Sequence, residues 1–254
     1  DKGNIHTETN GDPIGMEIRA QAFAFATNDE VNRMTFYNYE LINRGTQTLY
    51  NTYFSQYLDC DIGNYTDDYV GCDVSRGLGY TLNGDLIDQS DGGKPGYGEN
   101  PPAIGCDFFE GPYQDADELD NPGPYFNEET GQMVVPSVTD ALANNGIVYK
   151  GVGIGYSDSI IDNERFGMRR FTYYTSTSAP PYNDPSNAAE YYNFMQGNWA
   201  NGSDMFYGGL GYAGSTGAST VLSDYMFPGL SDPLNWATKG VDMSSAFPDG
   251  WFES

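Results

Sequence analysis

Basic residues are scarce in this chain: its 254 residues hold 11 Lys and Arg against 36 Asp and Glu, and the formal net charge is −25. Nucleic-acid binding needs basic patches that neutralise phosphates, and an anionic membrane surface attracts cations. The composition therefore argues against nucleic acid and against an anionic membrane surface as partners. No apolar run of about 18 residues is present, so the sequence predicts no transmembrane segment.

Cysteine and histidine are also rare. Cys60, Cys72 and Cys106 permit one disulfide in any of three pairings and leave one thiol over. No C-x-x-C pair occurs and His6 is the one histidine, which argues against a Cys/His metal site and against c-type haem. Ser-His and Cys-His catalysis are disfavoured for the same reason, while the carboxylates are too numerous to single out a glycosidase pair. The sequence therefore favours a non-catalytic protein, and a catalytic pair of carboxylates stays open as an alternative.

Carboxylates are concentrated in residues 59–73, where five aspartates lie among fifteen residues without a Lys or Arg. Oxygen ligands at alternate positions, followed by a Gly that permits a tight turn, are what a Ca²⁺ site requires. No Glu closes the loop twelve positions on, so an EF-hand is absent. The alternative is a solvated acidic loop. The predicted calcium ligands are Asp59, Asp61, Asp67, Asp68 and Asp73.

Two further acidic segments are weaker candidates for the same metal. Asp115 and Asp117 follow a predicted buried strand at residues 102–109, and Asp158 and Asp162 lie in an acidic turn. We expect that the clusters after residues 58 and 109 converge on one multi-ion site. Residues 59–120 hold twelve Asp and three Glu against Arg76 and Lys94, a local balance of −13. Such an uneven distribution argues against acidity that only reflects a salty habitat.

Period-two alternation of apolar and polar side chains from Met16 to Ala26 predicts a strand. More strands are predicted from the aromatic and β-branched content and from turns at Asn28–Glu30 and Asn43–Thr46. The second and third strands, residues 34–43 and 49–58, are expected to form an antiparallel hairpin because the connection between them is short. The further strands predicted are residues 34–43, 49–58, 69–74, 78–82, 102–109, 147–152 and 168–174.

One helix is predicted with Asp184 as the cap, Pro185 as its first residue and an end near Gly197, because apolar residues between Ala188 and Trp199 recur at helical spacing. Residues 138–144 suggest a further helical turn, and residues 201–254 suggest long loops laid over a sheet. We therefore expect residues 1–254 to form a single all-β domain, an antiparallel β-sandwich type with long Gly- and Asp-rich loops and one short helix.

Five phrases in fixed order resemble a family of large secreted surface proteins of the Bacteroidota that are exported by type IX secretion. They are residues 13–25 (Pro-Ile-Gly-Met-Glu-Ile-Arg-Ala-Gln-Ala-Phe-Ala-Phe), 34–43, 67–73, 76–80 and 162–171. The resemblance implies a cell-surface or extracellular location and contact with the type IX export machinery in transit. Members are mostly uncharacterised, and some neighbours are adhesins linked to gliding.

The chain departs from that family in two respects. The C-terminal sorting domain is missing, so the chain resembles an internal segment of a larger secreted protein. Members often carry a cysteine where this sequence has Thr81, which leaves Cys72 without that partner and Cys60 and Cys106 as an alternative pair.

Together these observations predict a calcium-stabilised structural or adhesive surface module, whose partners are calcium and other surface proteins or glycans. The alternative is a carbohydrate-binding or glycan-degrading module. That function would require exposed Tyr and Trp rings that form a stacking platform beside paired carboxylates.

Overall fold

The computed structural model describes residues 6–114, 116, 118–121, 125–127, 132–134, 152–156, 158–176 and 181–253. Its regular elements are mostly short antiparallel strands with one α-helix, so the all-β prediction is confirmed. The described strands form five small sheets, and the sandwich arrangement stays a prediction. No helix among the described residues has the length and apolar character needed to cross a membrane.

The element bounds follow the chain in order. They are β1 (Met16–Ala24), η1 (Glu30–Arg33), β2 (Thr35–Asn43), η2 (Tyr65–Asp67), β3 (Asp68–Asp73), β4 (Leu78–Asn83), β5 (Ile87–Asp88), β6 (Gly98–Glu99), β7 (Ala103–Asp107), β8 (Tyr125–Asn127), β9 (Gln132–Val134), β10 (Val152–Ile154), β11 (Arg165–Met168) and α2 (Ala188–Met195).

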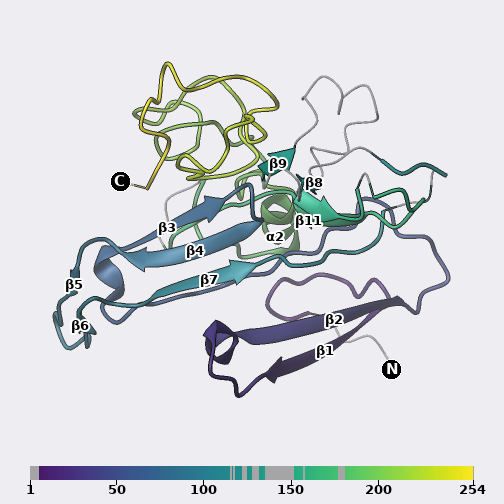
Figure 1. The fold of residues 1–254 in the computed structure, drawn as a ribbon, viewed down its shortest axis with the longest axis horizontal. Helices are drawn as coiled ribbons and strands as arrows, with labels where there is room; N and C mark the ends of the chain where they lie inside the picture. Colours follow the sequence, from purple (N-terminus) through teal and green to yellow (C-terminus); the bar gives the residue numbers. More distant parts are fainter. Residues whose placement is uncertain are drawn as a thin grey trace.

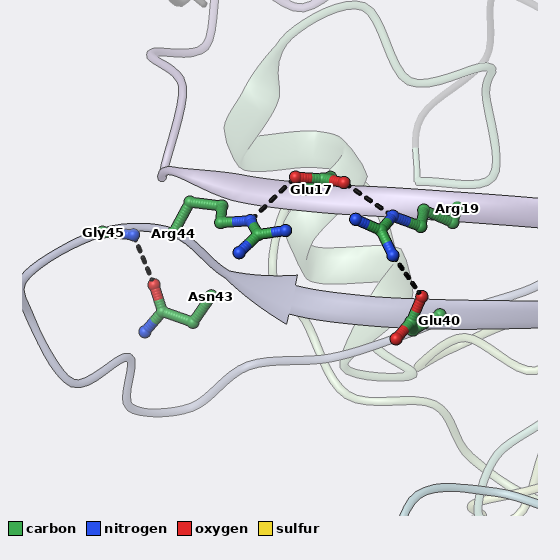
Figure 2. A network of polar contacts seen from close by, with 6 residues as sticks. All are labelled: Glu17, Arg19, Glu40, Asn43, Arg44 and Gly45. Atoms are coloured by element: carbon green, nitrogen blue, oxygen red, sulfur yellow. Dashed lines mark hydrogen bonds and ion pairs between the residues drawn. The ribbon is translucent and has the colours of Figure 1, made fainter.

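β1 and β2 form a regular antiparallel hairpin, and no residue of either strand is buried. The hairpin predicted between residues 34–43 and 49–58 is wrong, because residues 49–58 form no strand in the structure. Figure 2 shows the ion network on one face of this hairpin. Arg19 Nε lies 2.7 Å from Glu17 Oε1, and Arg19 also lies 3.0 Å from Glu40 Oε2 on the opposite strand. Arg44 Nε lies 2.8 Å from the other Glu17 oxygen. Pairs as exposed as these contribute little stability.

The sheet that positions the candidate site has the strand order β3-β4-β7, and every neighbouring pair is antiparallel. In Figure 1 it lies between the β1–β2 hairpin and the C-terminal coil, drawn in green and yellow. Hydrogen bonds join β3 to this coil, because Cys72 N donates to Phe227 O at 3.2 Å. Residues 201–253 therefore cover the sheet as loops, as predicted.

The hydrophobic core lies between β3 and this coil. Two clusters of buried side chains form it: Cys72, Val74, Tyr225, Trp236 and Ala237 make one, and Trp199, Met205, Tyr207, Met226, Phe227, Met243 and Trp251 make the other. Phe171 packs against both clusters. A Cβ added at Gly79 of β4 would lie 2.7 Å from the Phe171 ring. Because glycine has no side chain, the Phe171 ring can approach the sheet at this position.

Two predicted strands are wrong. Residues 49–58 form no ladder, and their rings contact separate elements: the Phe54 ring lies tilted against Tyr39 of β2, and Tyr53 lies edge-on to Tyr192 of α2. Residues 168–174 hold only the end of β11 and an isolated bridge at Phe171. The predictions at 138–144 and 147–151 lie outside the described residues.

The predicted helix exists but begins later than expected. Asn187, not Asp184, caps it, since the Asn187 side chain accepts hydrogen bonds from Ala189 N at 3.1 Å and Glu190 N at 3.2 Å. A cap must be followed directly by helical backbone, and residues 185–187 lie between Asp184 and the first helical residue, Ala188.

Candidate metal centre

The acidic loop folds back onto the end of the three-stranded sheet. Ile62 N donates to Asp68 Oδ2 at 2.7 Å, so the first residue of β3 holds the loop that precedes it. Ile62 and Asn64 are both buried, which shows that this part of the loop packs against the sheet and does not extend into solvent. The loop therefore leads into the start of β3, whereas the strand over residues 49–58, after which the sequence placed this loop, is not formed.

Asp88 of β5 holds the same loop from the other side. Its carboxylate is 1% exposed and accepts Asn64 N at 3.1 Å and Tyr97 N at 2.7 Å. Gly63 has φ +60, and a Cβ at this position would lie 1.9 Å from Asp88 Oδ2. Sequence reasoning missed Asp88, because nothing in its local context distinguishes it from the other aspartates of this segment.

Three acceptor oxygens at this corner have no hydrogen-bond partner although they are buried. They are Asp67 Oδ1, Asp68 Oδ1 and Asn83 Oδ1. Asp68 and Asn83 are directly opposed on β3 and β4, so their side chains lie on the same face of the sheet. The Asn83 residue as a whole is 6% exposed. Buried acceptors without donors are rare, and a cation is one group that satisfies several together.

Electrostatics at the corner also favour a cation. Burial raises the pKa of Asp68, and the neighbouring charges of Asp67, Asp88 and Asp61 raise it further, whereas the hydrogen bond from Ile62 N lowers it. In the described part of the chain, no ion pair joins these aspartates to a Lys or Arg. Like charges held together at a buried position are costly unless a counter-ion is present.

Lys94 is a basic residue that lies near the Asp68 corner. Its ammonium group lies 4.0 Å from the centre of the Tyr65 ring in η2, two residues before Asp67. The contact is a cation–π interaction, so Lys94 places positive charge near the corner without donating to the unpaired oxygens.

The structure brings together some of the predicted ligands and separates others. Asp61, Asp67 and Asp68 are close enough for their charges to act on one another. Asp59 is exposed, and its charge acts instead on Tyr57 and Cys60. Asp115 and Asp117 lie outside the described residues, so the expected convergence of the two clusters stays a prediction.

Asp73 lies at the opposite end of β3 from Asp68, a separation of about 16 Å at the usual rise per residue. Its carboxylate accepts Arg76 N at 3.0 Å and forms an ion pair with the Arg76 guanidinium. The structure therefore does not bring Asp73 to the Asp68 corner.

Asp158 and Asp162 act as backbone and side-chain acceptors in their own turn. Asp158 accepts Ile160 N at 2.8 Å and Asn163 Nδ2 at 2.9 Å. Asp162 accepts Glu118 N at 2.9 Å, which joins this turn to residues 118–121. These bonds give both carboxylates a structural role that needs no metal.

Two more carboxylates join the turn at residues 158–164 to residues 118–121. Asp120 Oδ2 accepts Ser159 N at 2.7 Å, and the buried Glu164 accepts Asn121 N at 2.5 Å. Asp120 Oδ1 and Asn163 Oδ1 are also buried acceptor oxygens without a hydrogen-bond partner, on residues that are half-buried as Asp67 and Asp68 are. This second acidic region is thus built chiefly from carboxylate-to-amide hydrogen bonds.

The donor set limits what the Asp68 corner can bind. Among the residues that the structure describes, no three His, Cys, Asp or Glu side chains are arranged to hold a metal ion together. Asp67 and Asp68 would supply two carboxylates and Asn83 an amide oxygen, with backbone carbonyls and water as further ligands. Ca²⁺ accepts such mixed oxygen sets in flexible geometry, whereas Mg²⁺ demands a near-ideal octahedron.

The aromatic residues bear on the carbohydrate alternative. All three tryptophans, Trp199, Trp236 and Trp251, are at most 4% exposed, so none offers a stacking surface. An open depression of about 470 Å³ lies between the hairpin and residues 45–52. Its lining side chains include no aromatic ring.

Comparisons with known proteins give no relative for this chain: no family model, curated protein or solved structure matches it.

Proposed function

We propose that this chain is a calcium-stabilised structural or adhesive module of a cell-surface or extracellular protein. The observation that carries the proposal is the set of three unpaired, buried acceptor oxygens on Asp67, Asp68 and Asn83. A bound Ca²⁺ would satisfy these oxygens and neutralise the Asp68 corner, which no Lys or Arg of the described chain does by an ion pair.

A stabilising role fits the position of the corner better than a catalytic one. The loop at residues 59–64 has no regular secondary structure and is held to the sheet by Asp68 and Asp88. A cation at Asp68 would fix the loop against β3 and β4, which carry one side of the hydrophobic core. Metal binding of this kind contributes directly to the free energy of folding.

The proposed location rests on the resemblance to type IX-secreted surface proteins of the Bacteroidota and on the metal. Extracellular calcium modules operate with Kd values of about 10⁻⁴–10⁻³ M, which a site with few carboxylates can provide. The proposed partners are calcium, other surface proteins or glycans, and the export machinery in transit.

One observation favours a carbohydrate-binding function as a second candidate. Tyr57 stacks on Tyr174 with ring centres 6.0 Å apart, and Tyr174 stacks on Phe194 at 4.5 Å. Tyr57 is 60% exposed, so its outer face is open to a sugar ring. Titration with soluble polysaccharides, followed by tyrosine fluorescence, tests this function. A Tyr57→Ala variant that binds equally well would contradict it.

Thermal unfolding in calcium and in excess chelator tests the main proposal. A ligand at a hundredfold excess over Kd stabilises the native state by about 2.7 kcal/mol. For a chain of this size, that free energy raises the melting temperature by about 5–10 °C. We expect a shift of this order with calcium, a smaller one with magnesium, and stoichiometric binding by calorimetry. Equal melting temperatures in calcium and chelator would refute the proposal.

A further inference from the structure

The register of the central sheet places two of the three cysteines in one row. Gly79 of β4 is opposite Cys72 of β3 on one side and Cys106 of β7 on the other. Cys72 and Cys106 are therefore separated by two strand spacings, about 9.6 Å. Disulfides need Cα atoms within about 7 Å, so this pair cannot be bridged without moving the strands.

Cys72 is also chemically sequestered. It is 0% exposed, and its thiol donates to Met226 O at 3.3 Å within the core. Burial raises the pKa of this thiol well above its ordinary value, so the reactive thiolate is rare.

Cys60 reaches the same face of the sheet from the acidic loop. Its thiol interacts with the side chain of Thr81 on β4. Thr81 is opposite Ile104 of β7, two residues from Cys106, so Thr81 and Cys106 are diagonal neighbours on one face. Diagonal neighbours lie about 7–8 Å apart, with Cβ atoms somewhat closer. Gly79, directly opposite Cys106, has no side chain of its own, and the Phe171 ring approaches the sheet at that position.

Cys60 and Cys106 are alike in their surroundings. Both are half-buried, and burial raises the pKa of each thiol. After burial and the charge of Asp107, the charge of Cys60 also raises the pKa of Cys106, which agrees with the two thiols lying on the same face of the sheet.

We infer that Cys60 and Cys106 form an intramolecular disulfide when the folded chain is exposed to a disulfide oxidant, while Cys72 remains a thiol. With oxidised glutathione, the Cys60 thiolate attacks one glutathione sulfur and releases the first glutathione. The Cys106 thiolate then attacks the Cys60 sulfur, forms the S–S bond and releases the second. The protein loses two hydrogens, and oxidised glutathione is reduced to two glutathione molecules.

The crosslink ties the acidic loop to β7, so that one covalent bond holds Asp59 and Asp61 near the sheet. It does not depend on calcium: the bond can form in a chain that binds no metal, and calcium can bind to a chain that is fully reduced. Failure of either proposal is therefore visible separately.

Oxidation of the purified, reduced chain by oxidised glutathione at mildly alkaline pH tests the inference. We expect the intact mass to fall by two hydrogens, and N-ethylmaleimide adducts after denaturation to fall from three to one. Peptide mapping without reduction should recover the segments of Cys60 and Cys106 linked together. The same reaction in concentrated urea is the control, since an unfolded chain should give all three pairings.

Variants sharpen the test. Cys72→Ala should still lose both remaining thiols, whereas Cys106→Ser should stop at a mixed disulfide of Cys60 with glutathione. Three adducts in the oxidised native chain, a persistent mixed disulfide on Cys60 in the unmodified sequence, or linked peptides that contain Cys72 would each overturn the inference. The peptide map of the unmodified chain decides the matter even if a variant fails to fold.

Discussion

Replacing Asp68 by Asn separates a metal ligand from a purely structural carboxylate, because the two roles predict opposite signs. The substitution keeps an acceptor oxygen for Ile62 N and nearly the same shape. It removes one negative charge from a corner where Asp61, Asp67 and Asp88 all raise the pKa of Asp68. In chelator the variant should therefore be more stable than the unmodified chain.

The size of that gain is modest. The Asp68 side chain is only partly buried, so solvent screening limits the relief of repulsion to about 0.5–1 kcal/mol. This corresponds to a rise of about 1–4 °C in melting temperature for a chain of this size. In calcium the sign reverses: if Kd weakens a hundredfold, the stabilisation by the metal falls from about 2.7 to about 0.4 kcal/mol.

The assay is thermal unfolding of both chains, each in calcium and in chelator. We expect the melting temperatures to cross: Asp68→Asn is the more stable protein without calcium and the less stable one with it. Asp73→Asn is the matched control, because Asp73 lies on the same strand at the far end and pairs with Arg76. It should keep the full calcium response. An Asp68→Asn chain that is destabilised equally in both conditions would refute the metal role.

Three other predictions follow from the contacts. Gly63→Ala should lower the free energy of unfolding by about 2–4 kcal/mol in urea titrations, because φ +60 is strained for Ala and its Cβ would overlap Asp88; an unchanged midpoint would contradict this packing. Burial raises the pKa of Asp232, so the contribution of this carboxyl group to stability is fully present below the ordinary carboxyl pKa and is lost as pH rises through the folded-state pKa. The Asp232→Asn variant should therefore show a flatter curve of unfolding free energy against pH in that range. A variant curve with the same slope as that of the unmodified chain would contradict the prediction. Glu17→Gln breaks the exposed pairs with Arg19 and Arg44 and should leave the melting temperature unchanged within error, so a drop of several degrees would show that the hairpin depends on them.

Local patterns predicted the strands well where partners are close in sequence. β1 and β2 follow from alternation and an intervening turn, and β3 and β4 lie within a residue or two of their predicted bounds. Residues 49–58 carry the same strand-forming composition but find ring contacts with β2 and α2 and no neighbouring ladder. Composition indicates a preference for extended backbone, whereas strand pairing also requires a neighbouring strand in the folded chain.

The candidate site was predicted in part for the same reason. Asp61, Asp67 and Asp68 were found from their local density. Asn83 was not among the predicted ligands, and its position opposite Asp68 becomes apparent only from the register of β3 and β4. The exclusion of Asp73 was within reach of the sequence, because the strand predicted between residues 69 and 74 already separates it from Asp68.

The many carboxylates have a second use, which narrows the calcium hypothesis. Much of this chain has no ladder to satisfy its backbone amides, and side-chain carboxylates take the place of carbonyl partners. Asp232 accepts both Trp236 N and Ala237 N at 2.8 Å, and Glu253 accepts Val70 N at 2.5 Å.

A carboxylate with both oxygens so occupied has little to offer a metal. Asp88 is such a case, since Asn64 N takes one oxygen and Tyr97 N the other. Asp67 and Asp68 each keep a buried oxygen without a donor. Net charge alone therefore does not locate a cation. The discriminating property is an acceptor oxygen that the fold has buried and left unpaired. In the acidic loop that property belongs to Asp67 and Asp68, and it extends to Asn83 across the strand pair.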